Sequence, residues 1–176
     1  MLSHFMGNNP LVQFILQPIL IAGVLFHFVM GFVLEWQNRK ARPVTYAMYK
    51  GSRNSMFVSR NMIISGIVIL SFLVLHFYDF WVPEMDYKYI QVKPEDPDRY
   101  YEELIHKFES PIRVSLYCLS FIFLGLHLVH GLSSSTQSLG TNNKYASTIQ
   151  KISYAFGIGI PLGFCFIALY HFFIHL

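Results

Sequence analysis

The sequence predicts an all-α integral membrane protein, a helical bundle with four transmembrane helices. Hydrophobic residues make up 53% of the 176 residues and charged residues only 13%, whereas a soluble domain carries about 25% charged residues. Four windows contain no Asp, Glu, Lys or Arg, namely 1–34, 61–78, 114–143 and 152–176. Each contains an apolar run that can cross about 30 Å of hydrocarbon, which takes roughly 20 helical residues. Because these runs use most of the chain, we expect one transmembrane domain over residues 1–176.

The charges between the apolar runs predict how the spans are oriented. Residues 39–60 carry six basic side chains and no acid, whereas residues 79–113 hold nine of the ten acids. The positive-inside rule places the basic connection in the cytoplasm and the acidic one outside. The first and third spans then run inward, and the second and fourth run outward. The predicted spans are about 11–36, 61–80, 112–139 and 152–174.

The acidic connection contains a candidate amphipathic helix over residues 97–108, with an Asp-Pro start and glutamates in its first turns. The cysteines, Cys118 and Cys165, lie in apolar runs without CxxC spacing. This argues against covalent c-type haem attachment, an iron–sulfur cluster or a disulfide framework. The net charge is +3 and the basic residues border the spans, so nucleic acid is not an expected partner.

Three histidines, His27, His76 and His127, lie within three consecutive apolar spans. An ionisable side chain in hydrocarbon is costly and therefore marks a functional site. His27 lies in LFHFVMGF and His127 in GLHLVHGL, so Gly31 and Gly131 each follow one turn later on the same helix face. A glycine there leaves room for a porphyrin lying flat against the helix. The pattern predicts b-type haem held between helices.

The depths of the three histidines predict which of them can share an iron atom. His27 is 17 residues past Pro10 and His127 is 14 past Arg113, or about 26 and 21 Å from the outer edge. We therefore expect their rings to face each other nearer the cytoplasm. His76 lies about 5 Å from the outer boundary and would need a different second ligand. Two imidazoles fill both axial positions of a haem iron, which suits electron transfer.

The remaining histidines are weaker candidates for ligands. His130 follows His127 by three residues and lacks the glycine one turn later. The others lie near span ends or in connections, where histidine is readily solvated: His4, His106, His171 and His175.

Four segments carry a family resemblance: SHFMGNNPLV, LFHFVMGFVLEWQNRKARPVTY, SRNMIISGIVILSFLVLHFYDFW and GLHLVHGLSSSTQSLG. The chain resembles the cytochrome b membrane-anchor subunit of bacterial succinate:quinone oxidoreductase (succinate dehydrogenase or fumarate reductase) in its single-chain dihaem form. The resemblance implies a location in the bacterial inner membrane. It also implies that His27 and His127 bind the haem near the cytoplasm and that His76 is one ligand of an outer haem.

The chain departs from the family pattern in two ways. The family has five membrane helices, and the second ligand of the outer haem lies on the first, which has no counterpart in this chain. We expect a further span to precede residue 1. The family also associates an acidic residue near the outer end of the next helix with quinone protonation, whereas this chain has Gln13 and Gln17 there and no carboxylate.

The resemblance implies flavoprotein and iron–sulfur subunits on the cytoplasmic face and membrane lipid around the spans. Electrons would pass between those subunits, one or two haem b groups and a quinone, menaquinone being expected, without succinate chemistry in this subunit. The basic segment 39–60 is the expected docking surface, and Arg39, Arg42 and Arg60 are candidate partners of haem propionates, although the positive-inside rule explains these charges equally well. The alternatives are a cytochrome b anchor of a hydrogenase or formate dehydrogenase, and a haem-free transporter whose histidines line a polar path.

Overall fold

The computed structural model describes residues 8–41, 62–94, 96, 98–140 and 145–174, and these residues form helices and no strands. The first helical run is a π-helical turn, η1, followed by α2. The second is α5 with its continuations η2, α6 and η3, and the short helix α7 and the long helices α8 and α9 follow. Their bounds are η1 Val12–Leu16, α2 Gln17–Lys40, α5 Met62–His76, η2 Phe77–Trp81, α6 Val82–Met85, η3 Asp86–Ile90, α7 Arg99–Phe108, α8 Pro111–Ser138 and α9 Ala146–Ile174.

In the part of the chain that the structure describes, four helical runs are long and apolar enough to cross a membrane: Val12–Lys40, Met62–Ile90, Pro111–Thr136 and Ala146–Ile174. Large apolar side chains point outward from them. Phe26 on α2 and Phe166 on α9, for example, are both 68% exposed. Such a surface suits lipid and would be unstable in water. The chain is therefore a multi-pass membrane protein with an all-α fold, as the sequence predicts.

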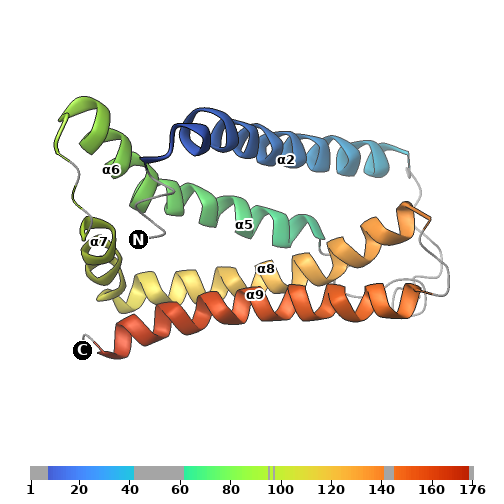
Figure 1. Cartoon of the computed structure of the whole chain (residues 1–176). Coiled ribbons are helices and arrows are strands. Elements are labelled where there is room, and N and C mark those ends of the chain that lie inside the picture. The colour runs from blue at the N-terminus through green and yellow to red at the C-terminus, as the bar shows by residue number, and fades with distance from the viewer. Residues whose placement is uncertain (1–7, 42–61, 95, 97, 141–144, 175–176) are drawn as a thin grey trace.

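The long helices alternate in direction, with α2 and α8 running one way and α5 and α9 the other (Figure 1). The α8 and α9 helices lie side by side, α5 packs on α8, and α2 packs on α5. The fully buried apolar side chains lie on α7, α8 and α9, whereas α2 has no buried residue. The core of the bundle is therefore built without α2. Its members are Phe108, Val114, Tyr117, Phe121 and Ala168.

Glycine allows α8 and α9 to approach closely. A Cβ atom at Gly157 would lie 2.6 Å from Val129 Cγ2 and 2.8 Å from the Val129 backbone nitrogen. A Cβ atom at Gly125 would lie 3.2 Å from the Gly157 carbonyl oxygen. Small residues at such crossings let membrane helices gain van der Waals contact that larger side chains would prevent.

The second helical run extends beyond the predicted span, because it continues to Ile90 where the sequence suggests an end near residue 80. The prediction ended the span at the first charge, Asp79, but that carboxylate is fully buried and paired within the protein. Glu84 is likewise paired with Lys88 one turn later, at 2.6 Å. Neutralised charges do not stop a helix. The α2 helix also continues beyond its predicted end, to Lys40, and Glu35 pairs with Arg39 on it.

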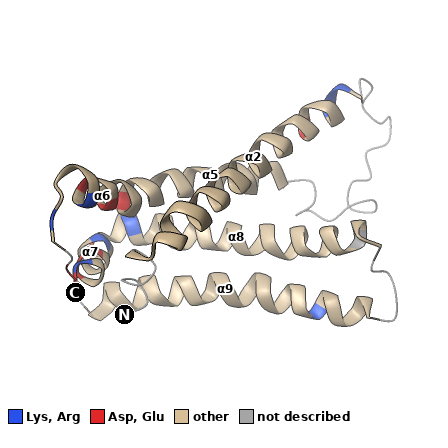
Figure 2. Cartoon of the chain, turned by 45° about the horizontal axis from the view of Figure 1, so that its top comes forward, with Lys and Arg blue, Asp and Glu red and all other residues tan. Residues whose placement is uncertain are grey.

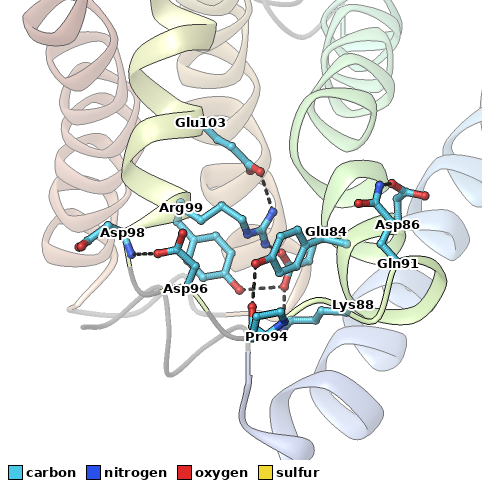
Figure 3. Close-up of polar contacts among 11 residues, drawn as sticks. Glu84, Asp86, Lys88, Gln91, Pro94, Asp96, Asp98, Arg99 and Glu103 are labelled. Carbon is cyan, nitrogen blue, oxygen red and sulfur yellow. Dashed lines mark hydrogen bonds and ion pairs between the residues drawn. The ribbon is translucent and has the colours of Figure 1, made fainter.

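Charged side chains gather around α6 and α7 at one end of the bundle, while the long helices are largely free of them (Figure 2). The predicted amphipathic helix is present as α7. Arg99, at its start, forms ion pairs with Glu84 on α6 and with Glu103, the latter at 2.6 Å (Figure 3). Tyr100 donates a hydrogen bond to Glu84 at 2.8 Å, and the Arg99 guanidinium lies 4.2 Å from the Tyr87 ring centroid. These contacts fasten α7 to the end of the second span.

Candidate functional site

The rings of His27 on α2 and His127 on α8 lie together, with centroids 6.1 Å apart and planes at 83°. Their spacing in the sequence predicts this pairing at one level of the bundle. A metal held by two imidazole nitrogens at about 2.0–2.1 Å places the ring centroids roughly 6.3 Å apart. The separation therefore fits a pair of axial ligands to one iron atom.

The first turn of α5 holds the His127 ring. Ser65 Oγ lies 3.0 Å from His127 Nδ1 and donates a hydrogen bond to the Met62 carbonyl oxygen at 2.8 Å. A Cβ atom at Gly66 would lie 4.0 Å from His127 Cε1, so the helix backbone passes close to the ring. Ser65 was not predicted from the sequence. The available signal was a Ser-Gly pair inside an apolar run, at the end of the span nearest the predicted haem level.

The two predicted glycines lie in different surroundings. A Cβ atom at Gly31 would meet nothing within 4 Å, so the face of α2 one turn beyond His27 is open. A Cβ atom at Gly131 would lie 3.8 Å from Met62 Cε, the end of a flexible side chain. His27 is itself exposed, since α2 packs mainly on α5. Gly31 therefore lies on an exposed and unobstructed face of α2, one turn from His27.

His76 occupies a second level. Its ring packs against Phe72, Phe80 and Tyr117, with centroids 5.7, 5.2 and 6.4 Å away. Its Nδ1 atom is buried and has no hydrogen-bond partner within the described part of the chain. Tyr117 precedes His127 on α8 by ten residues, or about 15 Å of helix. This separation agrees with the prediction that His76 cannot share a metal with the His27–His127 pair.

A buried carboxylate lies one turn beyond His76. The Asp79 side chain is 0% exposed and accepts a hydrogen bond from the Tyr117 hydroxyl at 3.1 Å. Arg113 Nε lies 2.9 Å from one Asp79 oxygen, and Lys107 Nζ lies 3.9 Å from the other. The cluster therefore joins the second span to α7 and α8 through charge. In the sequence, Asp79 stands at the start of the acidic connection, and for that reason it was not predicted as a buried residue.

The structure places the two glutamines on the first helical run. Gln13 lies in η1, where Tyr89 from the end of the second span donates a hydrogen bond to its side-chain oxygen at 3.4 Å. Gln17 begins α2 and is partly buried. A carboxylate near this end of the bundle is supplied by Asp79, from a different helix.

Of the remaining histidines, His130 lies on α8 three residues after His127. His130 lines a groove of about 440 Å³ between α8 and α9, together with Ser133 and Tyr154. His106 is exposed and its Nδ1 atom lies 3.3 Å from Glu109. The His171 ring contacts Tyr101 at 5.7 Å. His4 and His175 lie outside the described residues.

Most of the basic segment also lies outside the described residues, including Arg42 and Arg60. Arg39 is exposed and pairs with Glu35 at 2.7 Å. Within the described ranges, no three His, Cys, Asp or Glu side chains are grouped so that they could hold a bare metal ion. Axial ligation of haem needs two imidazoles only.

A comparison of the sequence with protein-family models finds no match, and comparisons with curated proteins and with solved structures find none either. The residues and the geometry of this chain are therefore the grounds for a function.

Proposed function

We propose that this chain is a haem b-binding electron-transfer subunit, the membrane anchor of a succinate:quinone oxidoreductase. The observation that carries the proposal is the His27–His127 pair, whose ring centroids are 6.1 Å apart in a helical membrane protein. The open face at Gly31 and the hydrogen bond that orients His127 support it. The four sequence segments that carry the resemblance supply the choice of family.

The chain's own residues hold and surround the cofactor in this proposal. His27 and His127 would hold the haem iron, and two imidazole ligands would leave no coordination position for oxygen. Apolar side chains on α2, α5 and α8 keep the site at low dielectric, which tunes the potential of the bound group. The haem supplies a one-electron redox couple when bound. Succinate or fumarate chemistry belongs to a soluble partner.

A second haem would use His76 as one ligand. The support for this is the ionisable His76 ring itself, which lies in the apolar second span. The resemblance places the second ligand of the outer haem on another membrane helix. In this proposal one haem is held by His27 and His127, and a second haem would depend on that other ligand.

The proposed orientation places the basic segment 39–60 in the cytoplasm of a bacterium, against flavoprotein and iron–sulfur subunits. The acidic end, with α6 and α7, faces outward. The quinone, menaquinone in this proposal, exchanges electrons with the chain within the membrane. The support for this arrangement is the distribution of charge along the chain, with basic residues at one end and nine of ten acids toward the other.

A reduced-minus-oxidised optical spectrum of the purified chain tests the haem. We expect b-type absorbance in the wild type and its loss in His27→Ala and His127→Ala. His130→Ala is the matched control, because that histidine lies on the same helix as His127 but lines the α8–α9 groove. Absorbance that disappears with His130→Ala and survives His127→Ala would contradict the ligand assignment. A haem-free wild type would favour a transporter.

Co-purification from the native membrane tests the choice of complex. A partner with covalent flavin and iron–sulfur clusters is expected. Nickel or molybdenum in the partner would instead identify the anchor of a hydrogenase or formate dehydrogenase.

A further inference from the structure

We propose that Ser65 is a positioning residue that fixes the tautomer of His127, so that the Nε2 lone pair is available to the haem iron. This inference rests on the proposed function. It assigns a role to a buried hydroxyl group, 5% exposed, that lies against a histidine of a different helix.

The direction of the hydrogen bonds determines the tautomer. A serine hydroxyl has one hydrogen to donate, and Ser65 lies 2.8 Å from the Met62 carbonyl oxygen, which can only accept. With its hydrogen directed to that carbonyl, Ser65 accepts from His127 Nδ1, at 3.0 Å, in the arrangement we propose. The Nδ1 atom then carries the proton. In a neutral imidazole the other nitrogen, Nε2, is left with its lone pair.

The position of Ser65 makes this constraint rigid. The residue lies in the first turn of α5, which packs on α8. The helix backbone is close to the His127 ring there, because a Cβ atom added at Gly66 would lie 4.0 Å from His127 Cε1. A partner that accepts the second imidazole N–H fixes the ring and raises the basicity of the ligating nitrogen. A more basic ligand stabilises ferric over ferrous iron, so Ser65 should lower the midpoint potential.

The test uses the full chain purified with haem and three substitutions. Ser65→Ala removes the acceptor, and Ser65→Thr keeps a hydroxyl at the same place. Ser71→Ala is the matched control, because Ser71 lies on the same helix, donates to the Ile67 carbonyl at 3.0 Å and is exposed. The measurements are the haem content, the midpoint potential by redox titration, and the low-temperature electron paramagnetic resonance of the ferric form.

We expect Ser65→Ala to weaken ferric haem binding roughly tenfold more than ferrous binding. This corresponds to a rise in midpoint potential of about 59 mV for a one-electron couple. The ferric resonance should shift as well. Ser65→Thr should restore both values, and Ser71→Ala should leave both unchanged.

Two outcomes overturn the inference while the proposed function stands. One is a Ser65→Ala protein that binds haem with the wild-type potential and resonance. The other is a shift that Ser65→Thr fails to reverse. If Ser65→Ala does not fold, Ser65→Cys is the substitute, because it has a similar volume and a weaker acceptor. It should shift the midpoint potential in the same direction by a smaller amount. A wild-type midpoint potential in Ser65→Cys also overturns the inference. A wild-type chain without haem is a failure of the proposed function itself.

Discussion

Replacing Asp79 with asparagine should destabilise the bundle more than any other single loss of charge in the described residues. The substitution keeps the shape of the side chain and an oxygen that can accept the hydrogen bond from Tyr117. It removes the negative charge that faces Arg113 at 2.9 Å and Lys107 at 3.9 Å. Both cations would then be left beside a neutral group at the junction of α7, α8 and the second span.

The distances set the magnitude. At an effective dielectric constant of about 20, unit charges separated by the 2.9 Å between Arg113 and Asp79 attract by about 6 kcal/mol. The cost of burying the carboxylate offsets several kcal/mol of this, and removal of one partner of a buried pair typically costs about 3–5 kcal/mol. The side chains of Lys107 and Arg113 are 25% and 29% exposed, so water can partly solvate them. We therefore expect a loss of about 3 kcal/mol.

The assay is reversible unfolding of the purified chain in mixed micelles, titrated with a denaturing detergent. Glu35→Gln is the control, because Glu35 and Arg39 form an exposed pair on α2, and such pairs contribute about 0–1 kcal/mol. A double variant, Asp79→Asn with Arg113→Gln, should lose less than the two single losses combined. Equal losses for Asp79→Asn and Glu35→Gln would refute the reasoning.

Two further substitutions probe the packing and the charged end of the bundle. Gly157→Ala should destabilise the α8–α9 contact by about 1–3 kcal/mol, because the added methyl group would lie 2.6 Å from Val129 Cγ2. Gly159→Ala is the control and should be neutral in the same unfolding assay, because a methyl group there would have nothing within 4 Å. Arg99→Ala should release α7 from Glu84. If this costs about 1–2 kcal/mol, the population of molecules in which α7 is detached from the second span rises roughly 5–30-fold. We expect faster limited proteolysis near residue 94, and unchanged cleavage would contradict this.

The sequence was sufficient for the architecture, because the signal for a membrane helix is long and depends on composition alone. Four uncharged windows predicted four membrane helices, and the described residues contain four. The ends of the helices were less predictable. The predicted second span ended at Asp79, and only the folded chain brings Arg113 and Lys107 to that carboxylate so that the helix can continue to Ile90.

The candidate site was predictable in part for a similar reason. His27 and His127 could be paired from depth, since two parallel spans measure distance from the same membrane surface. Ser65 and Asp79 could not be identified from the sequence, because their roles depend on contacts with side chains from other helices. A serine in a membrane helix often bonds only to its own backbone, as Ser71 and Ser120 do in this chain. The glycine that follows Ser65 is a local difference from those two, but it does not show that the hydroxyl group faces a histidine of another helix.

The weak packing of α2 affects how easily the rings of His27 and His127 can separate. His127 belongs to the tightly joined unit of α5, α8 and α9, whereas His27 belongs to a helix with no buried residue. Tilting α2 away would therefore expose almost no additional core. His127 is therefore held in place by the packing of the core, whereas α2, which carries His27, can move sideways in the membrane without unfolding of the remaining helices.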